Sequence, residues 1–170
     1  IGEEVRLNLS TPAGIWPVLM DPAQVSQIVM SLALNARDAM PGGGRILIQT
    51  AGAVLDEEQS KEHGMAAGKC LVVSIHDTGH GMDEDTQSHV FEPFFTTKEK
   101  GKGTGLGLST VYGIVKQSGG CIEVESKPGR GATFKIYFPR VESAATETES
   151  VVVGGDSVRG RETVLLVEDE

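Results

Sequence analysis

The sequence contains few cysteines, few aromatic residues and no long apolar run, and each shortage excludes a class of protein. Two cysteines among 170 residues cannot build a disulfide framework, and there is no Cys-x-x-Cys pair of the kind that indicates zinc. The longest apolar runs fall far short of the ~18 residues that a membrane span needs. Cys70 and Cys121 each adjoin a strand-like run, so we expect two buried, reduced thiols in a cytosolic domain.

The formal net charge of −9 argues against general nucleic-acid binding, although the charge is unevenly distributed. Residues 142–170 hold eight acidic and two basic residues, which accounts for −6 of the total. The composition of residues 141–161, rich in Ser, Thr, Glu, Ala and Gly, is typical of a linker. We therefore expect one folded domain over residues 1–140. The acidic opening residues do not resemble a signal peptide, which favours a cut within a longer protein.

Glycine is plentiful, yet two well-known nucleotide-binding glycine loops are missing. No Gly-x4-Gly-Lys-Ser/Thr string exists, because Lys102 is followed by Gly103 and Lys69 by Cys70. No Gly-x-Gly-x-x-Gly motif exists either. A P-loop and a dinucleotide-binding fold are both disfavoured.

The glycine segment that is present, residues 101–108, places four glycines in alternation and opens an apolar, helix-compatible run. The first N–H groups of a helix have no internal partner, and the helix dipole favours negative charge there, so an anion can bind at such a place. Taken alone, the segment is equally compatible with a phosphate-binding lid and with a flexible surface loop.

Hydrophobic periodicity predicts the remaining elements. An N-cap acceptor and a proline at the first helical position, Asp21-Pro22, predict the start of a helix that runs to about Ala39. Residues 53–68 have no firm period and are expected to form a loop or hairpin. The other predictions are an antiparallel hairpin of strands over 5–9 and 15–20, strands over 45–50 and 69–77, helices over 83–90 and 105–118, and a closing hairpin of 121–126 and 133–138.

Polar residues fall at two informative places on these elements. Ser31, Asn35 and Asp38 share one flank of the first helix, where the buried face meets the surface. Asp77 ends the strand over 69–77 and is followed by two nearby glycines, an arrangement that suits recognition of an exocyclic amine. A solvated helix shoulder and a plain Asx turn are the simpler alternatives.

Three of the eight aromatic residues, Phe91, Phe94 and Phe95, stand within five positions. They are compatible with an insertion into the core. They are equally compatible with an aromatic plug that packs when a lid closes.

The ordered motifs together resemble the N, G1, F, G2 and terminal Gly-x-Thr boxes of the ATP-binding domain of bacterial sensor histidine kinases. That family belongs to the ATPase superfamily that includes gyrase, Hsp90 and MutL. The resemblance covers about residues 3–140, and residues 162–170 resemble the truncated start of a response-regulator receiver domain. The motifs are the Asn-bearing helix 27–39, Asp77-x-Gly79-x-Gly81, Phe91-Glu92-Pro93-Phe94, Gly103-x-Gly105-x-Gly107 and Gly131-Ala132-Thr133.

The resemblance implies a two-layer α/β sandwich of the Bergerat type. We expect a mixed, mostly antiparallel sheet of about five strands, with three helices on one face and a lid over the nucleotide. The parent would be a hybrid histidine kinase, with this catalytic domain over residues 1–140 and a linker over 141–161.

The resemblance also implies ATP and Mg²⁺ as cofactors and assigns residues to them. Asn35 would hold Mg²⁺, Asp77 would accept from the adenine amino group, and Thr133 would support the adenine corner. Lys98 or Lys102 would touch the γ-phosphate. The implied nucleotide-binding set is Asn35, Asp38, Asp77, Gly79, Gly81, Met82, Lys98, Lys102, Gly103, Thr104, Gly105, Leu106, Gly107, Leu108 and Thr133.

Two positions depart from the family pattern. Ser31 stands where many of these kinases carry a second Asn and where hydrolytic relatives carry a Glu that activates water. Serine cannot act as that general base at neutral pH, which favours phosphotransfer over intrinsic ATPase activity. Asp38, beside Arg37, stands where many of these kinases carry a Lys, so phosphate contacts from this helix are less certain than Asn35 itself.

The phosphoacceptor histidine is expected to be elsewhere. None of His63, His76, His80 and His89 has an acid next to it and a proline behind at the required spacing, and His63 and His89 are expected to be exposed. No residue of the chain is assigned as catalytic with certainty. The expected partners are a histidine-bearing dimerisation domain of the same parent and the downstream receiver domain, with no nucleic acid and no membrane contact.

The expected function is to bind Mg-ATP in the cytoplasm and to donate its γ-phosphoryl group to that histidine. A non-catalytic nucleotide-sensing or protein-interaction module on the same fold is the alternative, and a true ATPase is the third possibility. The signal, the membrane anchoring of the parent, the output and the oligomeric state are left open.

Overall fold

The computed structural model describes residues 4–98 and 103–142. Lys102, most of the expected linker and the expected receiver strand lie outside the described residues. No helix of the described part is both long enough and apolar enough to span a bilayer. In chain order the elements are β1 (Val5–Ser10), α1 (Pro22–Asp38), β2 (Gly44–Leu55), α2 (Glu57–His63), β3 (Gly68–Asp77), α3 (Glu84–His89), α4 (Gly107–Gln117), β4 (Cys121–Ser126) and β5 (Ala132–Pro139).

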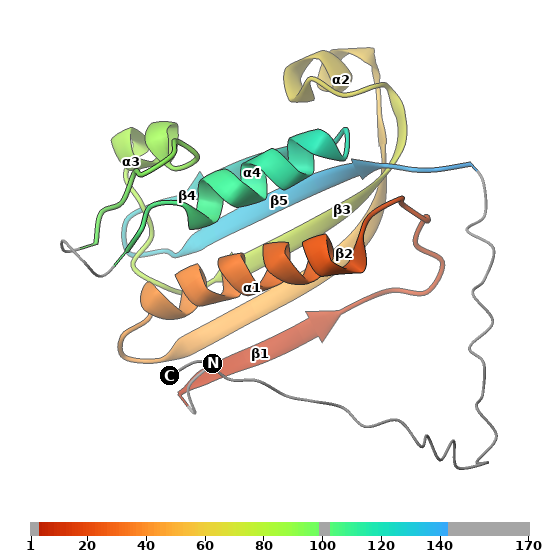
Figure 1. Cartoon of the computed structure of the whole chain (residues 1–170). Helices are drawn as coiled ribbons and strands as arrows, with labels where there is room; N and C mark the ends of the chain where they lie inside the picture. The colour runs from red at the N-terminus through yellow and green to blue at the C-terminus, as the bar shows by residue number, and fades with distance from the viewer. Residues whose placement is uncertain (1–3, 99–102, 143–170) are drawn as a thin grey trace, which may run out of the picture.

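The five strands form one sheet in the order β1-β2-β3-β5-β4. The β1–β2 pair is parallel, whereas the β2–β3, β3–β5 and β4–β5 pairs are antiparallel. Figure 1 shows α1 and α4 side by side over one face of the sheet, with α3 at one end of this layer. The end of α2 contacts the opposite face, where the His63 ring stacks on that of Tyr137. The predicted two-layer sandwich with a mixed, mostly antiparallel sheet is confirmed.

The core lies between the sheet and the α1–α4 layer. Ile28 and Leu32 lie on the buried stripe of α1, and Val111 and Val115 lie on that of α4. In β5 the residues alternate, so that every second side chain faces the helices and is buried: Ala132, Phe134, Ile136 and Phe138. Each buried aliphatic or aromatic side chain contributes about 1.5–3 kcal/mol relative to its exposed state, so this layer contact is the main stabilising feature of the domain.

The predicted strand over 15–20 is wrong, and so is the antiparallel hairpin with residues 5–9. Residues 15–20 form no strand, and β1 instead pairs in parallel with β2. A parallel pair needs a crossover, and α1 supplies it. Pro17 has no backbone N–H to donate to a ladder, while the Trp16 ring packs against Gly52 of β2. The apolar run of 15–20 therefore packs as a loop.

Residues 57–63, predicted to lie in a loop or hairpin, form α2. Asp56 accepts hydrogen bonds from the backbone N–H groups of Glu58 and Gln59, and the Gln59 side chain accepts one from the Asp56 N–H. This is a reciprocal capping box. Gly64 ends the helix in the left-handed conformation, with a φ of 62°. The capping box and the C-cap glycine are both present in the sequence. The helix was not predicted because the segment lacks an apolar stripe.

Candidate functional site

A cavity of about 480 Å³ opens between the C-terminal half of α1, the end of β3 and the start of α4. Three segments that are far apart in the sequence contribute to its wall. The predicted site residues that line the cavity are Asn35, Asp38, Asp77, Gly81, Met82, Lys98, Gly103, Thr104, Gly105, Gly107 and Leu108.

Asp77 forms a buried corner at the end of β3, with only 4% of its surface exposed. Its Oδ1 accepts hydrogen bonds from the backbone N–H groups of Gly79, at 2.8 Å, and Ala132, at 3.3 Å. No described residue donates to the Oδ2 atom. The corner therefore holds one carboxylate oxygen with backbone amides and leaves the other available to a donor in the cavity.

Gly79 closes this corner without lining the cavity itself. A Cβ atom at Gly79 would lie 2.7 Å from the Ala39 carbonyl oxygen and 2.9 Å from Asp77 Oδ1. Both distances are shorter than real Cβ contacts allow. Any side chain at this position would displace either the end of α1 or the carboxylate, so the tight approach of α1 to β3 depends on glycine.

Asn35 lies beside the first turn of α4. A Cβ atom at Gly107 would come within 3.0 Å of Ser31 Oγ and 3.9 Å of Asn35 Nδ2, so a side chain there would require the Ser31 hydroxyl to shift. The N-cap residue Leu106 provides no side-chain hydrogen bond to α4. The first N–H groups of α4 are thus uncapped next to the Asn35 amide, and this part of the cavity favours an anion.

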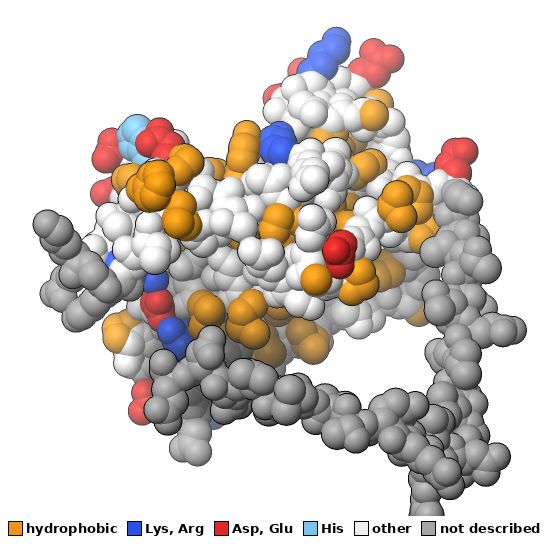
Figure 2. All heavy atoms as spheres, in the orientation of Figure 1, with side chains coloured by type: hydrophobic (Ala, Val, Ile, Leu, Met, Phe, Trp, Pro, Cys, Tyr) orange, Lys and Arg blue, Asp and Glu red, His pale blue; other side chains and the backbone are white. Residues whose placement is uncertain are grey.

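A salt bridge closes the opposite wall. Lys98 Nζ lies 2.6 Å from Asp38 Oδ2, and Arg37 Nη2 lies 2.7 Å from Asp38 Oδ1. Figure 2 shows basic and acidic side chains adjoining on this face of the molecule. Partial burial opposes ionisation of Asp38, but the hydrogen bonds from Lys98 and Arg37 outweigh it, so the pKa of this carboxyl lies below its ordinary value. The bridge ties the segment that follows Phe95 to α1.

The three clustered phenylalanines have different environments. Phe91 packs against the core, with its ring edge-on to that of Phe134 at a centroid distance of 6.4 Å. Phe95 lines the cavity, whereas Phe94 is exposed and adopts a φ of 68°. The Phe94 N–H donates to the Gly105 carbonyl at 2.9 Å, which connects this segment to the glycine segment. Phe91 therefore fits the predicted core insertion.

Three of the predicted residues that the structure describes do not line the cavity: Gly79, Leu106 and Thr133. Thr133 points to the opposite face of the sheet, where its Oγ1 lies 2.9 Å from His76 Nδ1. The alternation of β5 causes this, because Ala132 and Phe134 take the inward positions. Lys102 lies outside the described residues.

Sequence reasoning missed most of the apolar wall. The pattern of β5 contained the signal for Ala132 and Phe134, because alternate residues of a strand share a face. The remaining contributors have no motif of their own. The wall residues that were not predicted include Leu34, Ala36, Ala39, Thr86, Val90, Thr96, Thr97, Ala132 and Phe134.

Comparison with known protein families identifies the family of this chain. Residues 20–142 match the family described as "Histidine kinase-, DNA gyrase B-, and HSP90-like ATPase". The chain belongs to this family. The family assignment made from the five motifs is thereby confirmed.

Sensor kinases are among the similar sequences. The chain is 42% identical over 178 residues to sensor kinase CckA of Brucella abortus (strain 2308), a match that covers 100% of this chain and 19% of that protein. It is 35% identical over 140 residues to sporulation kinase E of Bacillus subtilis (strain 168), covering 82% of this chain and 17% of the relative. The chain thus spans less than a fifth of the length of these two relatives.

Solved structures agree with the fold. The full-length ShkA structure in complex with AMPPNP superposes with a TM-score of 0.64 and 26% identity, covering 83% of this chain and 27% of that one. The catalytic domain of histidine kinase ThkA gives a TM-score of 0.60 and 27% identity, covering 81% of this chain and 80% of that one. The chain is therefore an ATP-binding domain of the histidine kinase type.

Proposed function

We propose that this chain binds Mg-ATP in the cavity and donates the γ-phosphoryl group to a histidine on a separate dimerisation domain of its parent protein. The observation that carries the proposal is the convergence of Asp77, Asn35 and the start of α4 on one cavity. Phosphoryl transfer depends on positioning and on charge neutralisation more than on covalent help from the protein. The groups that line this cavity would serve both purposes.

Adenine would occupy the corner at the end of β3. The Asp77 oxygen that the backbone leaves free can accept a hydrogen bond from the exocyclic amine of the base. Met82 and Leu108 line the same cavity and offer apolar surface to a flat ring. A buried carboxylate that already accepts two backbone N–H groups has a fixed direction, so it would select an amine donor over a carbonyl.

Mg²⁺ would bind at Asn35. The Asn35 side chain lines the cavity and makes no side-chain hydrogen bond within residues 4–98 and 103–142, so its amide oxygen is available. Mg²⁺ takes oxygen ligands and retains several waters, which suits a single neutral protein ligand completed by phosphate oxygens. The ion would neutralise phosphate charge, while the uncapped N–H groups of α4 would hold the remaining phosphate oxygens.

Transfer to an external acceptor is favoured over hydrolysis. Ser31 lies one turn before Asn35 and lines the cavity at the position where hydrolytic relatives carry a general base. A hydroxyl group cannot accept a proton from water at neutral pH as a carboxylate does. The acceptor would therefore be a histidine on another domain.

We further propose that residues 141–161 connect this domain to a receiver domain that begins at 162–170. The similarity to CckA supports this organisation, because it extends over the whole chain and therefore includes the acidic C-terminal segment. A phosphorelay would carry the phosphoryl group from the histidine to an aspartate of that receiver.

The test has two stages. Calorimetric titration with Mg-ADP should give saturable binding, and labelled ATP should phosphorylate the histidine-bearing domain of the parent when that domain is added. Asn35→Ala should abolish transfer, whereas Asn8→Ala, on exposed β1 away from the cavity, should leave it unchanged. Absence of nucleotide binding would contradict the proposal.

Two other outcomes would identify the other functions. Binding without transfer would indicate a nucleotide-sensing module, an alternative that the engagement of Lys98 by Asp38 favours, because that lysine must leave the carboxylate before it can contact a phosphate. Sustained phosphate release by this chain alone, lost in Asn35→Ala, would indicate an ATPase.

A further inference from the structure

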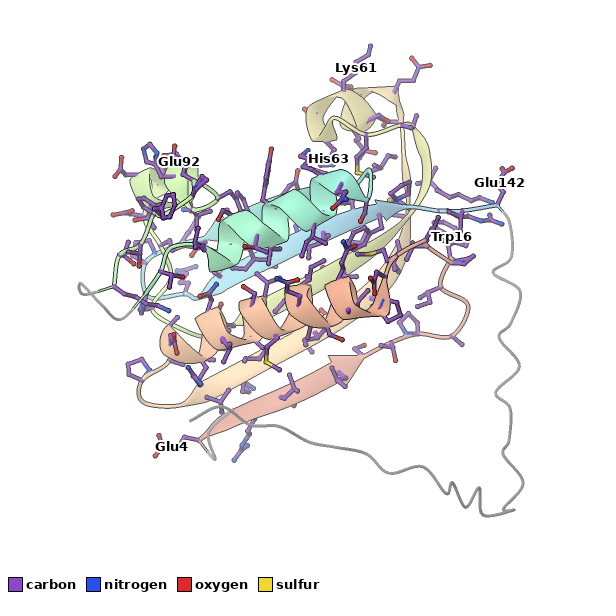
Figure 3. The ribbon with its side chains drawn as sticks, in the orientation of Figure 1. Glu4, Trp16, Lys61, His63, Glu92 and Glu142 are labelled. Atoms are coloured by element: carbon purple, nitrogen blue, oxygen red, sulfur yellow. The ribbon has the colours of Figure 1, made fainter. Side chains whose placement is uncertain are left out.

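Three different metal-ligating side chains meet where α2 folds against β4. The ligand atoms of His63, Cys121 and Glu123 all lie within 4.8 Å of one another. Cys121 and Glu123 are two positions apart on β4 and so share one face of the sheet. None of the three lines the nucleotide cavity, and Figure 3 shows His63 near α2, at the end of the sheet opposite Glu92.

The surrounding residues fix the orientation of these side chains. Tyr137 lies directly opposite Cys121 in the β4–β5 register, and its ring stacks under the His63 ring at a centroid distance of 4.6 Å. Its hydroxyl donates to Glu123 Oε2 at 3.3 Å. Tyr137 thus orients two of the three ligands at once, which is what the residues around a metal site normally do.

The hydrogen bonding of His63 is incomplete. The side chain is only 12% exposed, so the expectation of an exposed histidine is wrong. Its Nδ1 lies 2.6 Å from Glu123 Oε1, yet it makes no aligned hydrogen bond within the described part of the chain. A buried ring nitrogen without an aligned partner costs free energy, and a cation between nitrogen and carboxylate would satisfy both atoms.

We propose that His63, Cys121 and Glu123 bind a Zn²⁺ ion, with water as the fourth ligand, and that the ion fastens α2 to β4. The ligand set of one imidazole, one thiolate and one carboxylate suits Zn²⁺, whereas Mg²⁺ and Ca²⁺ prefer oxygen ligands alone. Binding would release the thiol proton of Cys121 to solvent. The site is separate from the one proposed for Mg²⁺.

The rearrangement that zinc requires is small. Two ligand atoms at about 2.0–2.1 Å from a tetrahedral ion lie roughly 3.3 Å apart, so the His63–Glu123 contact must open by less than about 1 Å. Rotation of the Glu123 side chain, which is 36% exposed, can supply this movement. The Cys121 sulfur lies at most 4.8 Å from the other two ligand atoms and must come within about 3.5 Å of them, which side-chain rotation can supply while the strands stay in place.

Cobalt titration of the full chain, after treatment with a chelator, is the deciding experiment. Co²⁺ in a tetrahedral thiolate site should give a near-ultraviolet charge-transfer band and strong visible bands at one equivalent, and Zn²⁺ should displace it. Cys121→Ser should remove the thiolate band. Cys70→Ser is the matched control: it changes the other buried free thiol, which donates to the Ala53 carbonyl, and should leave the band intact.

Two further variants test the carboxylate ligand and the hydroxyl group that orients it. Glu123→Gln should weaken Zn²⁺ binding, measured by calorimetry, without the risk to α2 that a change at His63 carries. Tyr137→Phe keeps the ring and removes only the hydroxyl, so we expect about tenfold weaker binding. Asn35→Ala should leave the cobalt spectrum unchanged.

The proposal is overturned if no thiolate band appears, or if the band survives in Cys121→Ser. It is also overturned if Zn²⁺ affinity is the same in Glu123→Gln as in the unaltered chain. In each of these cases the cluster is a structural ion pair that holds α2, and circular dichroism would confirm that the variants are folded.

Discussion

The two walls of the nucleotide cavity are built in opposite ways. At the end of β3, Asp77 is buried and is held by backbone amides of two different segments. On the other side, Lys98 reaches Asp38 through long, substantially exposed side chains. Backbone amides at the end of a sheet cannot move independently, whereas an exposed ion pair exchanges readily with water.

Because of this difference, we expect the wall at Asp77 to recognise the base and the wall at Asp38 and Lys98 to adjust to the phosphates. A charge-assisted hydrogen bond to a buried carboxylate contributes about 1.5–3 kcal/mol, while an exposed ion pair contributes about 0.2–1 kcal/mol. If the proposed function is correct, the corner at Asp77 determines which base is bound. The Asp38–Lys98 bridge can be exchanged for a phosphate contact at little cost, so this wall can adapt to the length of the phosphate chain.

The largest effect should come from Asp77→Asn. The substitution keeps the size of the side chain but removes the charge that the adenine amine would meet, so we expect Mg-ADP affinity to fall about 100-fold, which corresponds to about 3 kcal/mol. Calorimetry measures this loss. Asp85→Asn, on the exposed surface of α3, is the control and should bind as the unaltered chain does. Equal affinities in the two variants would show that the rigid wall does not recognise the base.

An intermediate effect is expected at the link between the phenylalanine and glycine segments. Gly105 has a φ of 66°, and a Cβ atom there would lie 2.3 Å from the Phe94 carbonyl carbon. Gly105→Ala should therefore lower thermal stability by about 1–3 kcal/mol and weaken nucleotide binding about tenfold.

Gly113→Ala tests the same substitution in a place without strain. Gly113 lies within α4, and no atom comes within 4 Å of its ideal Cβ position. We expect this variant to be stabilised by up to about 1 kcal/mol, because alanine is the better helix former. Thermal unfolding compares the stabilities of the two variants. If Gly105→Ala is as stable as the unaltered chain, the contact between Phe94 and Gly105 does not hold the two segments together.

The smallest effect concerns the adjustable wall. Asp38→Asn frees Lys98 for a γ-phosphate, so ATP should gain up to about fivefold in affinity relative to ADP, while unfolding free energy falls by less than about 1 kcal/mol. Lys135→Met removes a comparable surface pair, with Glu125, outside the cavity and should change neither affinity. A loss of ATP affinity in Asp38→Asn would mean that the carboxylate itself contributes to binding.

The pH dependence of this bridge has a definite sign. The pKa of Asp38 is lowered in the folded state, so its contribution to stability is present above the ordinary value of 3.8 and is lost as the pH falls below it. The stability difference between Asp38→Asn and the unaltered chain should therefore be constant near neutrality and shrink in acid. Thermal unfolding at several pH values measures it.

Local sequence signals predicted most of the fold but failed where contacts between distant segments determine the structure. The start of α1, the alternation of β5 and the acid that ends β3 are all encoded within a few residues, and each was predicted. The parallel pairing of β1 was not predicted, because its partner is a strand beyond α1. Residues 15–20 form an apolar run that is also typical of a short strand, yet they pack as a loop.

The candidate site shows the same limit. The positions of Asn35 and Asp77 followed from motif spacing, whereas Thr133 was predicted near the base and lies on the other face of the sheet. Strand alternation decides that placement, and β5 assigns Ala132 and Phe134 to the cavity instead. The cluster at His63 had no motif, since its three ligands come from α2 and β4.

The sequence by itself determined the chemical groups and their order: an amide on a helix, a carboxylate at a strand end and a glycine segment before a second helix. Periodicity and capping are local properties, so they can be recognised in the sequence alone. Only the tertiary structure decided that these groups face one cavity, that Lys98 is held by Asp38, and that His63 meets Cys121. Those facts depend on contacts between residues distant in the chain, and packing between layers selects them.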